Sequence, residues 1–474
     1  MRYKRLFLLV LFSTILFASP QCWAGVNDTF GIGAKATSLG GAFTAYADNL
    51  SAIHYNPAGL TQLEGTHLTV GLHVADIDYE QKVSQKDFRY GTDPEGGTTD
   101  QNNSDLLYIP QLGISHTPQD SRWTFAYGVY APFGLHGWWN SSNANNRYDT
   151  SETYNDRIIY ASPTIAYKIR DNLSVGFSVG MGSTDEGVTI NLRVPMVTAA
   201  TGGAFNGYTT SAGKLKFELE DQTTFSANIG LMWQAIDWMA VGLTYRSESH
   251  SKMTGHSTYS YSEEGKTIID SLYGAGATPD QETCRTRLSF THPQSVSLGF
   301  KFDLTEKWRV MLDCDWTDWS VRRNEKFNYD CEPMFLRVTA DFLNSGKQKD
   351  ALVVERHWKD TYEFRIGTEY EALDWLTLRF GYHYRPSAVP EKYWDNTWPL
   401  IDYHVFSFGS GMKINKKMSL DFAYSLVWGN DHDIENNESK NLTQDTSVYS
   451  PYYGDEVNVR TEIHNFMLTF NYRF

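Results

Sequence analysis

Residues 176–180 (Gly-Phe-Ser-Val-Gly) match the G-x-S-x-G pattern of serine hydrolases. In those enzymes the serine lies on a sharp turn between a strand and a helix, which exposes its hydroxyl group for nucleophilic attack. Here the segment from Leu173 to Met181 alternates large apolar side chains with small or polar ones, so the motif lies inside an unbroken strand. We therefore interpret the match as a coincidence, name no catalytic residue, and predict that the chain is not an enzyme.

Two groups of carboxylates could serve as acid–base pairs or metal ligands. Asp313 and Asp315 lie two residues apart, and Asp431, Asp433 and Glu435 form an acidic run. The run lacks the glycine and the spacing of a calcium loop, and the sequence contains no H-E-x-x-H, P-loop or paired-cysteine zinc pattern. We expect Asp313 and Asp315 to line the inner side of a sheet and the acidic run to be a solvated loop, with no cofactor and no metal.

The elements that position these residues are strands. In the last nine residues, Phe466, Leu468 and Phe470 alternate with polar or smaller residues, and the chain ends on the aromatic Phe474. Because side chains in a strand point to alternate faces, this segment has one apolar face and one mostly polar face. Fourteen segments are predicted as strands: 66–82, 106–118, 121–131, 156–169, 173–186, 213–234, 238–250, 286–303, 308–322, 357–370, 375–385, 402–413, 418–429 and 458–474.

Short connectors alternate with long polar ones along this series. The long connectors are 83–105, 132–155, 187–212, 251–285, 323–356, 386–401 and 430–457. Short turns at one end and long loops at the other are typical of outer-membrane barrels, and an even number of strands lets the sheet close without an edge, as lipid requires. We therefore predict an all-β chain, with a 14-stranded antiparallel transmembrane β-barrel over residues 66–474.

Three cysteines lie within the predicted barrel. Cys284 and Cys331 flank one hairpin whose turn is near Thr305, about equally far from each, so both should lie at the same end and close enough to form a disulfide. Cys314 shares a strand face with Trp316, and we expect it to be a lipid-facing thiol outside that bridge. An alternative in which none of the cysteines is paired stays open.

The N-terminus predicts export from the cytoplasm. A basic start precedes an apolar run from Leu6 to Phe17 and a cleavage site before Gly25, which is the layout of a signal peptide over residues 1–24. Residues 25–65 are rich in small residues and show no two-residue period. We expect this segment to be compact and to pack inside another part of the fold, with one short helix near Gly40 to Ala47.

The net charge and the composition limit which classes of partner the protein can have. The formal net charge of −15 excludes nucleic acid, whose binding requires cationic surface. The aromatic fraction of 15% and the polar mean hydropathy of −0.44 fit a membrane β-barrel and also a large soluble β protein, so composition alone does not choose between them.

Several motifs together resemble the FadL/TodX family of outer-membrane transporters for hydrophobic compounds. Residues 56–58 (Asn-Pro-Ala), preceded by 40–43 (Gly-Gly-Ala-Phe), are similar to the N-terminal hatch of that family. Other similar runs are 130–135, 292–299, 315–320, 358–361 and 471–474. The resemblance implies a 14-stranded barrel in the bacterial outer membrane, a hatch over residues 25–65 inside its lumen, internal ligand pockets, and a side opening beside a kinked third strand.

The resemblance also implies roles for two groups of residues. In the hatch, Asn56, Pro57 and Ala58 would gate the path when ligand binding shifts the segment; a purely structural turn is the alternative. In the third strand, residues 132–134 (Pro132, Phe133, Gly134) would form the kink and the lateral opening, because proline cannot donate a backbone hydrogen bond to its neighbour. The alternative is that Pro132 only ends the strand.

The implied function is uptake of hydrophobic molecules, first of all long-chain fatty acids, by passive diffusion with lateral exit into the bilayer. Uptake of aromatic hydrocarbons and a general porin are the alternatives. Trp138 and Trp139 would form an apolar surface where ligand is taken up, or else belong to an aromatic girdle. The expected partners are a hydrophobic small molecule, outer-membrane lipid and lipopolysaccharide, and the protein is expected to be a monomer.

Overall fold

The structure, a computed structural model, describes residues 31–85, 98–101, 106–138, 150–197, 205–343, 348–395, 397–398, 400–434 and 455–474. The predicted signal peptide and Trp139 lie outside this part of the chain. Within it, none of the helices is both long enough and apolar enough to span a membrane.

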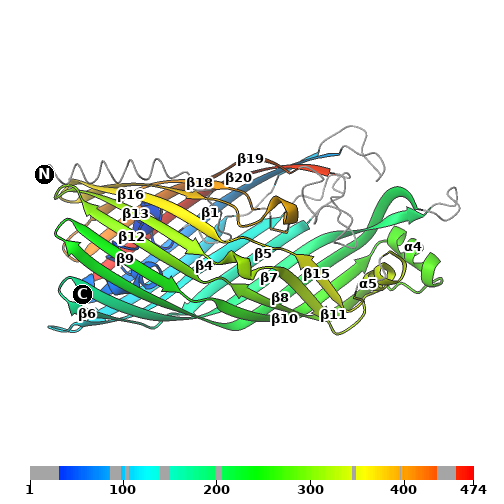
Figure 1. Cartoon of the computed structure of the whole chain (residues 1–474), viewed down its shortest axis with the longest axis horizontal. Helices are drawn as coiled ribbons and strands as arrows, with labels where there is room; N and C mark the ends of the chain where they lie inside the picture. The colour runs from blue at the N-terminus through cyan, green and yellow to red at the C-terminus, as the bar shows by residue number, and fades with distance from the viewer. Residues whose placement is uncertain are drawn as a thin grey trace.

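Twenty strand segments form one antiparallel sheet that closes on itself (Figure 1). They are β1 (Gly65–Gln85), β2 (Thr98–Gln101), β3 (Leu107–Thr117), β4 (Trp123–Trp138), β5 (Thr150–Ala161), β6 (Thr164–Arg170), β7 (Leu173–Val197), β8 (Phe205–Ile236), β9 (Met239–Arg246), β10 (Ser249–Tyr261), β11 (Gln281–His292), β12 (Ser295–Asp303), β13 (Trp308–Thr317), β14 (Asn324–Tyr329), β15 (Ala351–Glu355), β16 (Thr361–Leu373), β17 (Leu376–Arg385), β18 (Tyr403–Lys413), β19 (Met418–Ile434) and β20 (Asp455–Arg473). The first and last strands pair along their length, from His67↔Arg473 to Gln85↔Asp455, and complete the barrel.

The segments combine into the fourteen strands that the sequence predicts. Six strands consist of two segments each, namely β2 and β3, β5 and β6, β9 and β10, β11 and β12, β13 and β14, and β15 and β16. The predicted strand boundaries agree best at the end where the turns are short. At the other end β7, β8 and β4 extend further than predicted, and the helices α4 (Glu263–Tyr273) and α5 (Met334–Val338) and the π-helix Thr339–Leu343 lie there (Figure 1).

Four strand segments, β2, β10, β14 and β15, lie in segments that the sequence assigns mostly or wholly to loops, so the loop assignment was wrong there. In β10 the outward face carries Lys252, Thr254 and His256, and the inward face includes Ser251 and Ser257. Neither face is consistently apolar, so the pattern of a lipid-exposed strand is missing even though the backbone continues the same ladder.

Large apolar side chains cover the outside of the barrel. In β20, Phe466 and Leu468 are 46% and 48% exposed, whereas Met467 and Thr469 between them are 2% and 1% exposed. This confirms the predicted faces of the terminal strand. The same outward pattern recurs around the barrel, for example at Val70, Leu72, Leu112, Ile114, Phe125, Ile229, Trp233, Phe364, Leu378, Phe380, Phe408 and Phe422, as expected for a surface solvated by lipid.

The N-terminal segment from Gly31 to Leu63, here called the plug, fills part of the lumen (Figure 1). It contains α2 (Ala34–Ser38), α3 (Ala52–Tyr55) and a 3₁₀ helix, η1 (Pro57–Gln62). The helix predicted near Gly40 to Ala47 is wrong, because Gly40 and Gly41 have φ angles of +64° and +75°, which interrupt a right-handed helix.

Close approach between plug and wall depends on wall residues without side chains. A Cβ atom on Gly176 of β7 would lie 2.3 Å from the carbonyl carbon of Pro57 and 2.4 Å from the amide nitrogen of Ala58. Gly176 belongs to the G-x-S-x-G run, and its neighbour Ser178 is buried in β7, where its hydroxyl accepts a hydrogen bond from Thr164. The run therefore lies inside a strand, as the sequence predicts, and this strand also contacts the plug.

We predict that Gly176→Ala displaces the plug without preventing barrel formation. The added methyl group overlaps backbone atoms, which costs about 1–3 kcal/mol unless the plug moves away. The expected result is a higher ionic conductance in planar bilayers, with Val175→Leu, on the outward face of the same strand, as the control. Conductance equal to that of the wild type would show that the plug accommodates the methyl group in place.

Candidate functional site

The Asn-Pro-Ala run holds the plug in one shape and fixes it to the wall. Asn56 is fully buried, and its side-chain oxygen accepts a hydrogen bond from the Ala58 amide (3.1 Å), which caps η1. Its Nδ2 donates to the carbonyl oxygens of Thr44 in the plug (2.7 Å) and Leu231 in β8 (3.0 Å). Pro57 begins η1, where its missing N–H has no cost.

Other wall residues bind the plug backbone. One carboxylate oxygen of Asp313 accepts hydrogen bonds from the amides of Phe43 and Thr44, both at 2.8 Å. Asn228 of β8 donates to the carbonyl oxygens of Ile53 (3.2 Å) and His54 (2.8 Å). The first member of the carboxylate pair noted in the sequence is thus an anchor for the plug.

The second member, Asp315, lies beside Arg365 of β16, with 2.8 Å between the carboxylate and Nε. Arg365 also contacts Glu363 at 2.9 Å. Both aspartates therefore line the lumen, as expected, and each is engaged with a neighbouring group.

Charged residues join the plug to the wall at the short-turn end. Lys35 of α2 contacts Asp48 at 2.7 Å and Glu369 of β16 at 3.8 Å. Burial by itself would lower the pKa of Lys35, but Asp48 and Glu369 outweigh burial and hold that pKa above its ordinary range. Glu369 also contacts Arg309 (3.0 Å) and Arg379 (2.7 Å), so one carboxylate ties three cations together.

A cavity of about 510 Å³ adjoins these charges. Its lining is Lys35, Tyr46, Asp48, Asn49, Leu50, Leu63, His67, Thr69, Lys301, Arg309, Glu369, Glu371, Thr377, Arg379, Gly411, Met412, Lys413, Ser419, Asp421 and Asn471. Because nearly half of the lining is charged, this cavity suits water and ions better than a hydrocarbon.

The plug contacts the third strand, β4, through His54 and Tyr130, whose rings lie 5.4 Å apart edge to face. Burial, together with the nearby cations Arg246 and Arg365, holds the pKa of His54 well below its ordinary value. The imidazole is therefore neutral at neutral pH and packs here as an aromatic ring.

The β3–β4 ladder ends part of the way along both strands. It runs from His116↔Phe125 to Leu112↔Val129, although β3 continues to Leu107 and β4 to Trp138. Beyond that point β3 pairs with β1, and β4 pairs with β5. A small cleft of about 20 Å³, mostly apolar, lies at this place and is lined by Ile32, Leu50, Ser51, Ile53, His54, Thr69, Gln111, Leu112, Gly113, Gly128, Val129 and Tyr130.

Pro132 lies at an irregularity of β4. The β4–β5 register shifts between Tyr130↔Ile159 and Phe133↔Arg157, so β4 continues beyond Pro132 and does not end there. Pro132 is buried and Gly134 is partly exposed. The side chains of Phe133 and Trp138 lie outside the described part of the chain, although both backbones belong to β4.

The loop-side half of the lumen is apolar and aromatic. A cluster of buried residues includes Phe290, Trp319, Trp358, Trp398 and Tyr403, contributed by strands and by the segments that connect them. The Trp319 and Trp358 rings lie 5.5 Å apart, and those of Trp358 and Trp398 lie 5.7 Å apart. Such a surface suits a hydrophobic ligand.

One cation, Arg322, lies inside this apolar cluster. Its guanidinium carbon is 3.5 Å from the centre of the Phe290 ring and 4.3 Å from that of Trp358. Its Nη2 is 3.5 Å from Glu325, whose other oxygen is bound to Arg356 at 2.7 Å. The side chain of Arg322 is only 4% exposed.

Among the described residues, the only carboxylate contact of Arg322 Nη2 is the 3.5 Å ion pair with Glu325. Three buried indole donors around these rings have no hydrogen-bond acceptor among the described residues: Trp319 Nε1, Trp358 Nε1 and Trp398 Nε1. Buried donors without an acceptor carry a free-energy cost that an incoming acceptor can remove. Sequence reasoning missed these three residues as a site. One signal was available in the sequence: residues 315–320 and 358–361, two of the runs that resemble the family, each contain tryptophan and lie on either side of the predicted loop 323–356.

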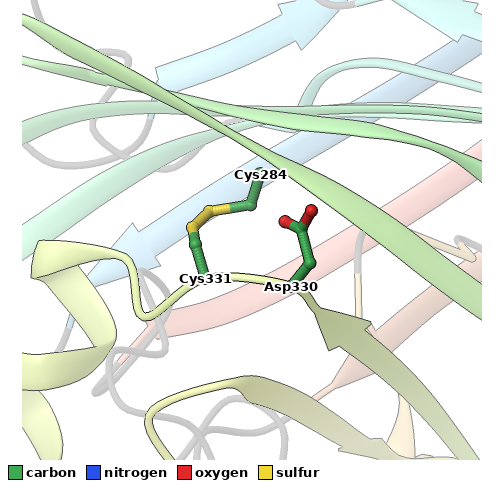
Figure 2. A group of neighbouring side chains, drawn as sticks. All are labelled: Cys284, Asp330 and Cys331. Atoms are coloured by element: carbon green, nitrogen blue, oxygen red, sulfur yellow. A yellow bond between two sulfur atoms is a disulfide. The ribbon is translucent and has the colours of Figure 1, made fainter.

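The two cysteines named from the sequence lie together at the loop end. Cys284 of β11 and Cys331, which follows β14, have Cα atoms 5.7 Å apart and are joined by a disulfide, with Asp330 beside it (Figure 2). Ligand atoms of these three residues lie within 4.8 Å of one another. Bridged cysteines offer no thiolate to a metal, so we interpret the group as a covalent link between two strand segments. Cys314 lies on the outward face of β13 with Trp316.

Comparison with known proteins gives consistent matches. A family model described as "Outer membrane protein transport protein (OMPP1/FadL/TodX)" matches residues 15–474. A putative outer membrane protein of Neisseria meningitidis is 24% identical, with 84% of each chain covered, and the long-chain fatty acid transport protein of Salmonella typhi is 20% identical, with 88% of this chain and 90% of that one covered.

Solved structures share the fold. A FadL homologue of Pseudomonas aeruginosa matches with a TM-score of 0.74 and 18% identity, over 96% of this chain and all of that chain. The toluene transporter TbuX of Ralstonia pickettii matches with a TM-score of 0.63 and 18% identity, over 94% of this chain and 99% of that chain.

We predict that Asn56→Ala loosens the plug locally. The substitution removes the donor to Thr44 and Leu231 and the cap of η1, which costs about 1–3 kcal/mol for the buried groups left without partners. Amide hydrogen exchange over residues 52–62 should become faster, while exchange in β16 to β18 stays unchanged. Asn56→Asp, which keeps the acceptor for Ala58 but loses the two donors, should be intermediate, and unaltered exchange in both variants would contradict an anchoring role.

Proposed function

The chain belongs to the OMPP1/FadL/TodX family of outer-membrane transport proteins, and from that premise we propose that it takes up long-chain fatty acids by passive diffusion. The observation that carries the choice of ligand is the position of Arg322. A guanidinium group surrounded by aromatic rings, next to three indole donors and 3.5 Å from the Glu325 carboxylate, suits a molecule with an apolar chain and one carboxylate. Hydrogen bonds between ionised partners are about twice as strong as neutral ones.

Uptake of aromatic hydrocarbons is the second candidate. It is supported by the aromatic character of the loop-side cluster, since flat rings stack well on tryptophan and phenylalanine. A hydrocarbon would leave the three donors without an acceptor, however, so the carboxylic acid is the better fit. A general porin is disfavoured by the plug, which is held to the wall by several buried hydrogen bonds. We also propose that the protein is not an enzyme, because Ser178 is buried within a strand.

Energetics favour release into the bilayer. Moving a chain of roughly 15 methylene groups from an apolar site into water costs about 0.8 kcal/mol for each group, or roughly 12 kcal/mol in all. The route toward the short-turn end is lined by charges, so a hydrocarbon chain would meet much of this cost there. Exit through the wall into lipid avoids most of it.

The proposed exit is the place where the β3–β4 ladder ends, beside Pro132, Phe133 and Gly134. This exit is supported by the cleft at that place, which is mostly apolar and is lined by Leu112 and Gly113 of the wall and by Leu50 and Ile53 of the plug. A shift of the plug would therefore widen the cleft directly. We propose that ligand arriving from the loop side causes this shift and that Asn56, Pro57 and Ala58 set its energy.

Ligand would first bind near the loop end of β4. Trp138 is the last residue of that strand, and Trp139 follows it. Both remain candidates for the uptake surface because amphipathic indole rings suit a boundary between lipid and water.

We predict that Arg322→Gln weakens the binding of a long-chain fatty acid by about 10–100-fold, because a charge-assisted contact is worth about 1.5–3 kcal/mol. Binding of the corresponding long-chain methyl ester should change less than about threefold. Isothermal titration in detergent measures both affinities, and Arg323→Gln, an exposed neighbour, is the matched control. Equal losses for acid and ester would mean that Arg322 supports packing and does not recognise the carboxylate.

We also predict that closing the wall stops transport. In a Cys314→Ser background, cysteines at Gln111 and Tyr130 would link β3 to β4 just beyond the last paired residues. Uptake of labelled fatty acid should fall several-fold when this link forms and recover on reduction. Cysteines at Ser115 and Ala126, which are already paired in the ladder, provide the control, and full uptake through a completely linked Gln111–Tyr130 variant would rule out this exit.

A further inference from the structure

The outer edge of the apolar band is marked by strand interruptions and aromatic residues. On one side of the barrel, four strands break between β9 and β10, β11 and β12, β13 and β14, and β15 and β16. Tyr245, at the end of β9, donates a hydrogen bond to Gln294 (3.0 Å), and Trp316, at the end of β13, donates to Asp360 (3.2 Å). Aromatic rings with polar tips facing one way are typical of the boundary between lipid and headgroups.

Beyond this edge the outward face of the sheet changes character. In β8 the exposed side chains are Phe225, Ile229 and Trp233 on the membrane side of a register shift near Asp221, and Lys214, Lys216, Glu218 and Glu220 on the other side. The strands therefore continue as a wall outside the hydrocarbon layer, and that wall is polar on its outer surface.

Four exposed cations form one patch on this wall, here called the basic patch: Lys252 of β10, Arg285 and Arg287 of β11, and Lys326 of β14. Lys252 pairs with Ser289, two residues from Arg287, and Arg287 pairs with Asn328, two residues from Lys326. Residues related in this way on one face lie about 7–8 Å apart. Arg285 and Arg287 also lie two residues apart on the same face of one strand.

Two carboxylates lie beside the basic patch, but they bind its backbone: Asp221 and Asp330 accept hydrogen bonds from the amides of Lys252 and Arg285. In the described part of the chain, none of the four side chains forms an ion pair. Lys216 and Lys266, by contrast, are each paired with a carboxylate at the same end of the barrel. Neighbouring like charges without a counter-ion repel one another, so the patch favours an external anion, on a protein whose formal net charge is −15.

The height of the basic patch above the hydrocarbon layer indicates which kind of anion it can bind. Lys252 follows Tyr245 by seven residues, which is roughly 20 Å along a strand, or about 15 Å in height at a tilt near 40°. A phospholipid headgroup layer reaches only about 5–8 Å beyond the hydrocarbon. An anionic headgroup made of several sugars extends far enough.

We propose that the basic patch binds the phosphorylated inner sugars of lipopolysaccharide packed against β10, β11 and β14. Arginine pairs with phosphate through two parallel N–H donors, and lysine adds point charges around it. The site is independent of the transported ligand, since it lies on the outer surface and shares no residue with the plug or the lumen.

The test compares two variants in lipopolysaccharide binding. Lys252→Gln, Arg285→Gln and Arg287→Gln are combined in one protein, and Lys214→Gln with Lys216→Gln, on the same face of neighbouring β8, form the control. Each protein is freed of bound lipid in detergent and titrated with purified lipopolysaccharide. Each removed cation should lower the affinity for lipopolysaccharide about fivefold, so the triple variant should bind roughly a hundredfold more weakly than the wild type. The affinity of the control should stay within about threefold of that of the wild type.

Two further titrations separate the possible sources of the anion. Enzymatic removal of the phosphates from lipopolysaccharide should weaken its binding to the wild type at least as much as the triple substitution weakens binding of native lipopolysaccharide. Phosphatidylglycerol vesicles should bind the wild type and the triple variant with similar affinity. Heat-modifiable migration in gels verifies that each barrel is folded. The proposal is overturned if the triple variant binds like the wild type, if the control weakens equally, or if removal of phosphate has no effect.

Discussion

Closure of the sheet is the constraint on which the structure depends. In a hydrocarbon environment every backbone N–H and C=O group needs a partner within the protein, and the pairing of β1 with β20 supplies the last of them. A closed sheet of fourteen strands has an interior too wide for its own side chains to fill. The plug occupies that space, and its small residues let its backbone approach wall glycines such as Gly176 and Gly381.

The lumen is divided into two chemical zones by the plug. On the short-turn side, Glu369 gathers Lys35, Arg309 and Arg379 around a charged cavity. On the loop side, aromatic residues surround the guanidinium group of Arg322. In the proposed mechanism, an amphiphilic molecule binds on the loop side of the plug and leaves through the side wall.

Alternation of apolar and polar residues was sufficient to predict the barrel, because the lipid-facing residues of strands such as β17 and β20 form an uninterrupted series. It failed for β2, β10, β14 and β15; the outer faces of β10 and β14 carry polar residues such as Lys252, His256 and Lys326. The plug helix was misplaced because composition does not reveal the positive φ angles of Gly40 and Gly41. The environment of Arg322 could not be predicted, since its neighbours come from segments far apart in sequence.

The plug also constrains the order of assembly. Ala34 donates its amide to Thr469, a partner 435 positions later in the chain, and the plug contacts wall strands from β4 to β20. Contacts of such long sequence separation form late and slowly. Because these bonds lie inside a cylinder without an edge, the leading segment is enclosed as the seam between β1 and β20 forms. Closure of the barrel therefore requires the final strand, and a chain truncated before β20 would lack both the pairing with β1 and the hydrogen bond between Ala34 and Thr469.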